Sequence, residues 1–225
     1  MSEIPGRRPD GRFHAAAGAV AAAIVFAGFA RSYYLRPLFK PTSLSLWLDL
    51  HGLLMTSWFA LFLVQVVLVS ASRRDIHRKL GTIGATLAPV ITVVGAITLF
   101  NAVARRTMPF NPKFVLLLLA FDGLYLVAFA AFVLTAVWKR NRPDIHKRLM
   151  LLATLSLLPP ALGRITGIFV RGEAPLVVLL SMLTLVIGAA AIDTFRHRRL
   201  SPALQWGAPA LVAANVVTFV LQSME

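Results

Sequence analysis

The chain has no cysteine among its 225 residues and only 9 acidic side chains. Without thiols, disulfide bonds, thiolate-held iron–sulfur clusters and a cysteine nucleophile are excluded. The shortage of carboxylates disfavours calcium sites and di-iron sites, which need several of them. No nucleotide-binding glycine loop occurs, and no lysine follows Leu200 to form a retinal Schiff base. These absences remove several common classes of enzyme and receptor.

Charge is also scarce, while long apolar runs are abundant. Charged residues make up 14% of the chain and hydrophobic residues 58%, whereas a soluble domain has about 25% charged residues. The 23 Lys and Arg gather in short clusters between the apolar runs. This pattern predicts an all-α integral membrane protein that forms one transmembrane domain over residues 1–225. Because the basic clusters flank apolar spans, we assign the net charge of +14 to lipid contacts and expect no nucleic-acid partner.

Seven apolar runs are long enough to cross a membrane, and the last is interrupted by Pro209. Each is expected to be a helix, since backbone polar groups in lipid must be bonded within their own segment. The expected spans are 13–31, 46–70, 79–102, 113–138, 147–169, 174–194 and 204–222.

The distribution of Lys and Arg predicts the orientation of these spans. The larger share falls on the side that carries the N-terminus, which indicates a cytoplasmic N-terminus in a bacterial inner membrane. On that side are Arg7, Arg8, Arg12, Arg73, Arg74, Arg78, Lys79, Lys139, Arg140, Arg142, Lys147, Arg148, Arg196, Arg198 and Arg199.

An internal repeat relates residues 46–102 to residues 113–169. The sequence RDIHRKL at 74–80 matches PDIHKRL at 143–149, and His51-Gly52-Leu53 matches Asp122-Gly123-Leu124. Spans two to five are therefore predicted to form two hairpins in a four-helix core with a pseudo-twofold axis along the membrane normal. Spans one, six and seven are expected at its periphery. Gln65 lies inside span two and needs a polar partner across the bundle.

The repeat places His77 and His146 in the first turns of two spans on the cytoplasmic side. Two imidazoles facing each other from neighbouring helices are what a six-coordinate b-type haem requires. The arginines beside them are candidates for pairing with haem propionates. The alternative is that the same histidines and arginines anchor the helices at the lipid interface. The candidate cofactor residues are His77, His146, Arg74, Arg78, Arg142 and Arg148.

A second polar group is expected near the other leaflet. His51 begins span two, Asp122 lies within span four, and Arg164 follows Pro159-Pro160 late in span five. An ionisable group within a membrane is costly and marks a functional hypothesis with a named partner. We predict an Asp122–Arg164 ion pair with His51 nearby, lined by Asn101 and Tyr125. The alternative is a polar clamp that only sets the helix register.

Four stretches of the chain are distinctive: SYYL (32–35), LHGLLMTSWFALFLVQ (50–65), DIHRKLG (75–81) and HKRLMLLATLSLLPPALG (146–163). They resemble a family of uncharacterised bacterial multi-spanning membrane proteins, and this resemblance implies no activity.

A looser resemblance is to cytochrome b561-like proteins, which have a four-helix core with two bis-histidine haems. One haem of that family takes its ligands from the second and fourth core helices, which His77 and His146 head here. The other haem takes its ligands from the first and third core helices. This chain has His51 on the first of these helices, but on the third it has Asp122 in place of a histidine. The resemblance therefore implies at most one haem of this type.

Three functions follow from these patterns. The first is electron transfer through one b-type haem, with a membrane quinone as partner. The second is a non-catalytic membrane subunit or assembly partner of a larger complex. The third is a proton-coupled transporter that uses His51, Asp122 and Arg164. Whether the chain is an enzyme stays open at this point.

Overall fold

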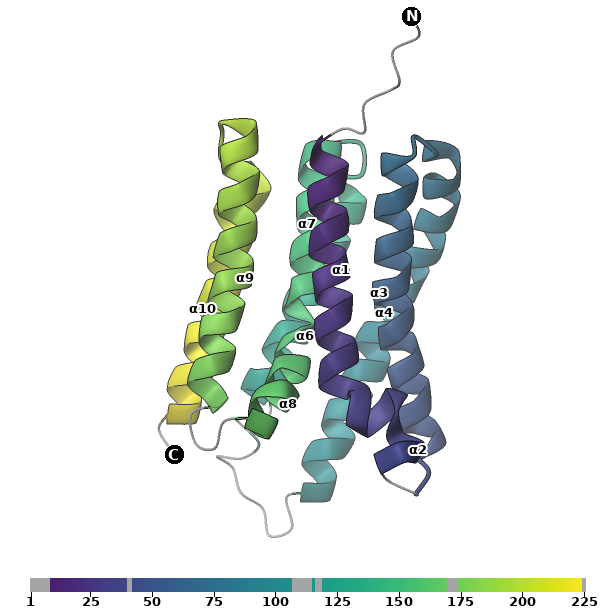
Figure 1. Cartoon of the computed structure of the whole chain (residues 1–225), viewed down its shortest axis with the longest axis vertical. Helices are drawn as coiled ribbons and strands as arrows, with labels where there is room; N and C mark the ends of the chain where they lie inside the picture. Colours follow the sequence, from purple (N-terminus) through teal and green to yellow (C-terminus); the bar gives the residue numbers. More distant parts are fainter. Residues whose placement is uncertain (1–8, 40–41, 107–114, 116–118, 170–173, 224–225) are drawn as a thin grey trace, which may run out of the picture.

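The computed structural model describes residues 9–39, 42–106, 115, 119–169 and 174–223, and these form helices joined by turns. Figure 1 shows the long helices side by side, running alternately up and down one bundle. In chain order the elements are α1 (Pro9–Phe29), η1 (Ala30–Tyr34, a π-helix), α2 (Arg36–Phe39), α3 (Leu46–Ser70), α4 (Arg74–Arg106), η2 (Leu119–Gly123, a π-helix), α6 (Leu124–Trp138), α7 (Pro143–Ser156), α8 (Pro159–Phe169), α9 (Ala174–His197) and α10 (Pro202–Ser223).

Six helical segments of the described chain are long and apolar enough to cross a membrane. A further candidate is the pair α7 and α8, which meet at a bend of 40°. Pro159 and Pro160 have no N–H to donate to the preceding turn, so the helix is interrupted there. Pro209, by contrast, is accommodated within a continuous α10.

The surface of these helices is apolar where a soluble protein would be polar. Along α6, for example, Leu134 is 74% exposed and Val127 is 66% exposed. Such surface is unfavourable in water but not in hydrocarbon. The chain is therefore a multi-pass membrane protein.

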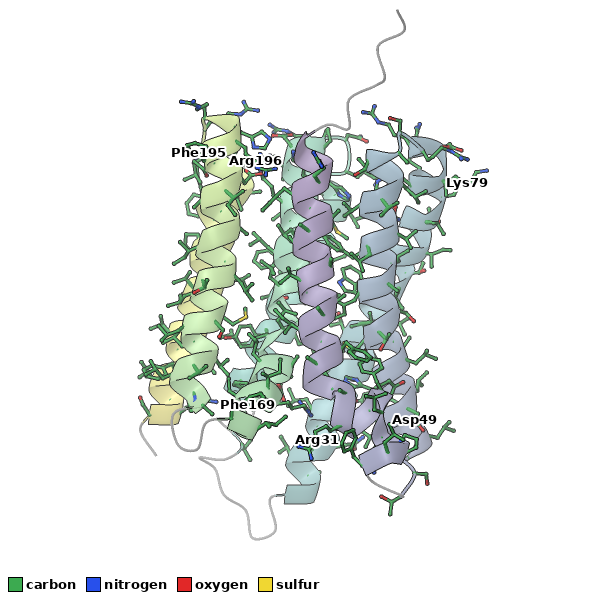
Figure 2. All side chains as sticks on the ribbon, in the orientation of Figure 1. Arg31, Asp49, Lys79, Phe169, Phe195 and Arg196 are labelled. Carbon is green, nitrogen blue, oxygen red and sulfur yellow. The ribbon has the colours of Figure 1, made fainter. Side chains whose placement is uncertain are left out.

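Charged side chains lie at both ends of the bundle. Figure 2 shows Lys79 and Arg196 at one end and Arg31 and Asp49 at the other. We call the first the basic end, because it holds the α3–α4, α6–α7 and α9–α10 turns with their clusters of Arg and Lys. The other, which holds η1, α2, η2 and α8, is the opposite end.

The helices pack as antiparallel neighbours. Helix α3 pairs with α4, α6 with α7, and α9 with α10, while α4 also contacts α6. At the centre the Trp58 indole of α3 donates to Thr154 Oγ1 of α7 at 3.3 Å. Its ring meets Phe129 of α6 edge-on, with centroids 4.8 Å apart. One tryptophan thus joins three of the helices that the internal repeat relates.

The first span is less peripheral than the sequence indicates. Helix α1 lies against α3, α7 and α8. The contact with α8 is close because Gly28 has no side chain: a Cβ added there would lie 2.5 Å from the Ala161 carbonyl oxygen. Small residues that let two backbones approach are a common device in membrane helix packing.

Several helices begin or end away from the expected limits. Helix α4 starts at Arg74 rather than 79 and continues to Arg106, so His77 lies inside the helix. The expected fourth span begins at 113, outside the described residues; apart from residue 115, its described part begins with the π-helix η2. The expected fifth span is divided into α7 and α8.

Candidate functional site

His77 and His146 lie next to each other at the basic end, with their rings in an edge-on arrangement. Each is the fourth residue of its helix, His77 of α4 and His146 of α7. Their ring centroids are 6.5 Å apart and the ring planes are nearly perpendicular, at 85°. The structure therefore brings together the two histidines that the repeat relates.

The His146 ring is held by a main-chain carbonyl. Its Nδ1 lies 2.9 Å from the Ala136 oxygen. That carbonyl is available because α6 is ending: the Arg140 N–H bonds to the Val137 oxygen, at 3.2 Å, and does not continue the helix onto Ala136. A carbonyl can only accept, so Nδ1 carries the proton. The other nitrogen, Nε2, is left with the lone pair that a metal needs.

The spacing of the two rings suits a single metal ion between them. A metal–imidazole bond is about 2 Å long and the nitrogen lies about 1 Å from the ring centre, so two imidazoles on one ion have centres about 6 Å apart. Within the described residues, no group of three or more His, Cys, Asp or Glu is placed to hold an ion. A pair of imidazoles suits a cofactor that brings its own equatorial ligands, which is the case for haem.

The four candidate propionate arginines have different environments. Arg74, Arg78 and Arg142 are exposed at the basic end. Arg148 is buried, and its Nε donates to Asp193 Oδ2 of α9 at 2.6 Å. Its Nη1 donates to the Asp144 carbonyl at 2.5 Å. Arg148 therefore already has a counter-ion.

Sequence reasoning did not identify Asp193. Both Asp193 and Arg148 are only 3% exposed, and His197 Nδ1 lies 2.7 Å from the Asp193 carbonyl oxygen and 3.5 Å from its Oδ1. The sequence does contain a signal for this residue: Asp193 lies near the end of an otherwise apolar segment, and an aspartate within the membrane needs a partner. The ion pair ties α9 to α7.

The opposite end gathers the second group of ionisable residues. His51 of α3, Asp122 of η2 and Arg164 of α8 come from three elements, and Arg164 lies within electrostatic range of the other two. The expected direct Asp122–Arg164 ion pair is not seen among the described residues. Instead Arg164 Nη1 donates to the Pro160 carbonyl at 3.0 Å, and its guanidinium lies 4.3 Å from the centre of the Phe29 ring.

The polar atoms of His51 and Asp122 are satisfied to different degrees. His51 Nδ1 lies 3.4 Å from Thr98 Oγ1, which also accepts from Trp47 Nε1 at 2.9 Å. Asp122 Oδ1 is buried and has no hydrogen-bond partner within the described residues. Both π-helices, η1 and η2, lie at this end, and π-helical turns are frequent at functional sites.

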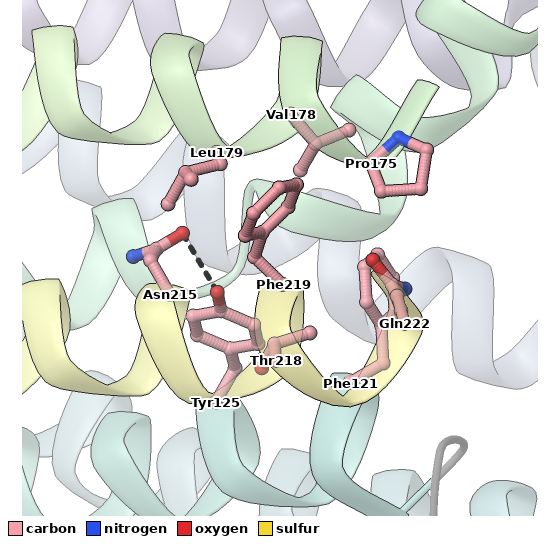
Figure 3. A pocket seen from close by; sticks show the side chains of 9 residues that line it. All are labelled: Phe121, Tyr125, Pro175, Val178, Leu179, Asn215, Thr218, Phe219 and Gln222. Carbon is pink, nitrogen blue, oxygen red and sulfur yellow. Dashed lines mark hydrogen bonds between the residues drawn. The ribbon is translucent and has the colours of Figure 1, made fainter. Parts of the chain in front are cut away.

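Tyr125 does not join that group. Figure 3 shows it in a separate small pocket between η2, α6, α9 and α10, with its hydroxyl donating to Asn215 Oδ1 at 2.7 Å. The pocket volume is about 10 Å³, the space of roughly one water molecule. It is lined by Phe121, Tyr125, Pro175, Val178, Leu179, Asn215, Thr218, Phe219 and Gln222. The pocket is therefore a packing feature that joins α10 to α6.

Comparison of the chain with protein-family models, with curated proteins and with solved structures finds no match. The geometry of the two ends of the bundle is therefore the basis for assigning a function.

Proposed function

We propose that this chain is an electron-transfer protein of the bacterial inner membrane that holds one b-type haem between His77 and His146. In this proposal α7 and α8 together form one broken span, so the chain crosses the membrane seven times. The N-terminus is cytoplasmic, and spans two to five form the pseudo-twofold core that contains the haem.

The observation that supports this proposal is the opposed pair of imidazoles. They occupy equivalent positions in the repeat, their centres are 6.5 Å apart, and His146 has its Nδ1 occupied by a carbonyl. Interfacial anchoring requires neither that the two rings lie next to each other nor that one tautomer of His146 is selected. Binding of one metal ion by both residues would require adjacent rings and, on each ring, a nitrogen lone pair that is free for the metal.

When bound, haem supplies one-electron chemistry. The residues of this chain hold and orient it. His77 and His146 would be its ligands, and the exposed Arg74, Arg78 and Arg142 would offer positive charge to its carboxylates at the basic end. We expect a membrane quinone as electron partner, because such a carrier shares the lipid phase with the helices.

Absorption spectroscopy tests the proposal. The protein is purified in detergent from haem-supplemented cells, and a reduced-minus-oxidised spectrum is recorded. We expect sharp α and β bands that are lost in His77→Ala and in His146→Ala. His51→Ala, which removes an imidazole at the opposite end, is the matched control and should keep the bands.

Imidazole rescue separates loss of a ligand from loss of the fold. Adding imidazole to the haem-loaded His77→Ala or His146→Ala protein should restore the bands, since the free ring can occupy the vacated position. A folded wild-type protein that remains colourless would overturn the proposal.

A second candidate function, proton-coupled transport, is favoured by the opposite end. Asp122 has a buried carboxylate oxygen without a partner in the described structure, and it lies close to a broken span. Broken helices that carry ionisable groups are typical of transporter sites. In proteoliposomes that contain a pH-sensitive dye, Asp122→Asn should abolish proton flux and the exposed Asp49→Asn should not. Equal flux in the two variants would exclude this candidate.

A further inference from the structure

The repeat that relates the two histidines also relates the residues beside them. His77 corresponds to His146 at an offset of 69, and the preceding helices correspond at an offset of 71, which pairs Gln65 with Ala136. Ala136 is the residue whose carbonyl holds His146. The equivalent position next to His77 is therefore occupied by Gln65.

The main chain at these two positions differs. Ala136 is two residues from the end of α6, at Trp138, where carbonyls lack helical partners. Gln65 is five residues from the end of α3, at Ser70, so its carbonyl still accepts the regular bond of the helix. The Gln65 carbonyl lies within hydrogen-bonding range of the His77 ring. It already accepts the helical bond, however, and it makes no well-aligned hydrogen bond with His77 Nδ1.

Two buried atoms beside this carbonyl lack partners within the described structure. One is His77 Nδ1 and the other is Gln65 Oε1. The first supplies a proton when the ring binds a metal through Nε2, and the second can only accept. The Gln65 side chain is directed toward α4, since its Nε2 would lie 3.7 Å from a Cβ placed on Gly81, one turn beyond His77.

We propose that the side-chain amide oxygen of Gln65 accepts the hydrogen bond of His77 Nδ1, as the Ala136 carbonyl does for His146. The Gln65 side-chain oxygen thus takes the role that the Ala136 main-chain oxygen has for His146. The Gln65 main-chain oxygen is less available for this role, because α3 continues beyond residue 65. Gln65 is then a positioning residue: it selects the His77 tautomer that directs Nε2 toward His146. This inference rests on the proposed function.

The hydrogen bond has a chemical consequence for a bound haem. An acceptor on Nδ1 makes the imidazole a stronger donor to the metal, which favours the oxidised ion. A neutral amide does so moderately and a carboxylate does so strongly. The identity of residue 65 therefore sets the reduction potential as well as the ring orientation.

Redox titration of the haem-loaded protein tests the inference. We expect Gln65→Leu to raise the midpoint potential and to weaken haem retention by about 10–100-fold, the usual effect of losing such a partner. Gln65→Glu should lower the potential below that of the wild type. Gln222→Leu, which removes a glutamine from the distant pocket of Figure 3, is the matched control and should leave the potential unchanged.

A readout without haem keeps the two proposals distinguishable. In haem-free protein labelled with ¹⁵N-histidine, His77 should be protonated on Nδ1 in the wild type and should lose this preference in Gln65→Leu. If the Gln65 variants bind haem with an unchanged midpoint potential and an unchanged His77 tautomer, the role of Gln65 is wrong while the proposed function stands. Absence of haem from the wild type would overturn the proposed function. The His77 tautomer in the haem-free protein would then decide whether Gln65 accepts the hydrogen bond.

Discussion

At the scale of single residues, the buried ion pair of Arg148 and Asp193 is the polar contact with the clearest energetic consequence. Both side chains are removed from solvent and lie 2.6 Å apart. Removing one partner leaves an uncompensated buried charge, whereas replacing both by apolar residues is often nearly neutral. The pair therefore contributes more to the specific placement of α9 than to net stability.

We predict that Asp193→Leu lowers the free energy of unfolding by about 3–5 kcal/mol and that the double variant Arg148→Met/Asp193→Leu recovers most of this loss. Unfolding by SDS, followed by circular dichroism, measures both. His197→Ala should have a smaller effect, because its contact with Asp193 Oδ1 is longer, at 3.5 Å. If the double variant is as unstable as the single one, the charge pairing is not the cause.

The Tyr125–Asn215 hydrogen bond is the second buried polar contact between an outer helix and the core. Tyr125→Phe leaves Asn215 Oδ1 without this donor, which should cost about 1–3 kcal/mol in the same unfolding assay. Tyr33→Phe is the comparison, since its hydroxyl donates to the Asp49 carbonyl at an exposed position where water replaces the bond. Equal losses in the two variants would contradict the argument from burial.

At the scale of the helices, the crossing of α1 and α8 depends on the absence of a side chain at Gly28. A Cβ there meets the main chain of Ala161, which cannot rotate away as a flexible side chain can. The helices must therefore separate to admit even a methyl group. Because α8 carries Arg164, such a shift also disturbs the group of ionisable residues at the opposite end.

Gly28→Ala is expected to destabilise the bundle, although alanine is the better helix former by about 1 kcal/mol. Gly188→Ala in α9 provides the matched test, because a Cβ there has nothing within 4 Å and only the helix preference remains. Thermal stability in detergent should fall for the first variant and stay equal or rise for the second. Stabilisation by Gly28→Ala would show that α1 and α8 are not in close contact.

At the scale of the whole molecule, the absence of cysteine permits a direct test of the topology. In the proposed orientation, single cysteines at Arg140 and Arg198, both exposed at the basic end, should react with an impermeant maleimide only when the cytoplasmic side is accessible. A single cysteine at Ser43, exposed at the opposite end, should react only from outside. Labelling of Arg140 and Ser43 from the same side would contradict the bundle.

Much of the architecture is predictable from the chain alone because it depends on local composition. Long apolar runs indicate lipid as the solvent, and the six long apolar helices of the described structure confirm that part of the prediction. The repeated Asp-Ile-His sequences place His77 and His146 in equivalent turns, and the structure brings their rings together. Both inferences need only hydropathy and the spacing of a repeat.

The partners of individual polar residues were not predictable in this way. Asp193 is 45 residues from Arg148 in the sequence, and their contact depends on how α9 packs on α7. The placement of α1 against α8 likewise depends on the backbone approach at Gly28.

Three features can be inferred from the chain alone: the lipid environment of the spans, their helical state, and the equivalence of His77 and His146 in the repeat. Each of these follows from a pattern that can be read along the chain. The folded arrangement was needed to show which carbonyl holds His146 and which charge neutralises Arg148. It also shows that the Asp122–Arg164 ion pair is absent from the described residues. Those outcomes depend on where helices end and cross, because a hydrogen bond or an ion pair forms only where packing brings donor and acceptor within about 3 Å.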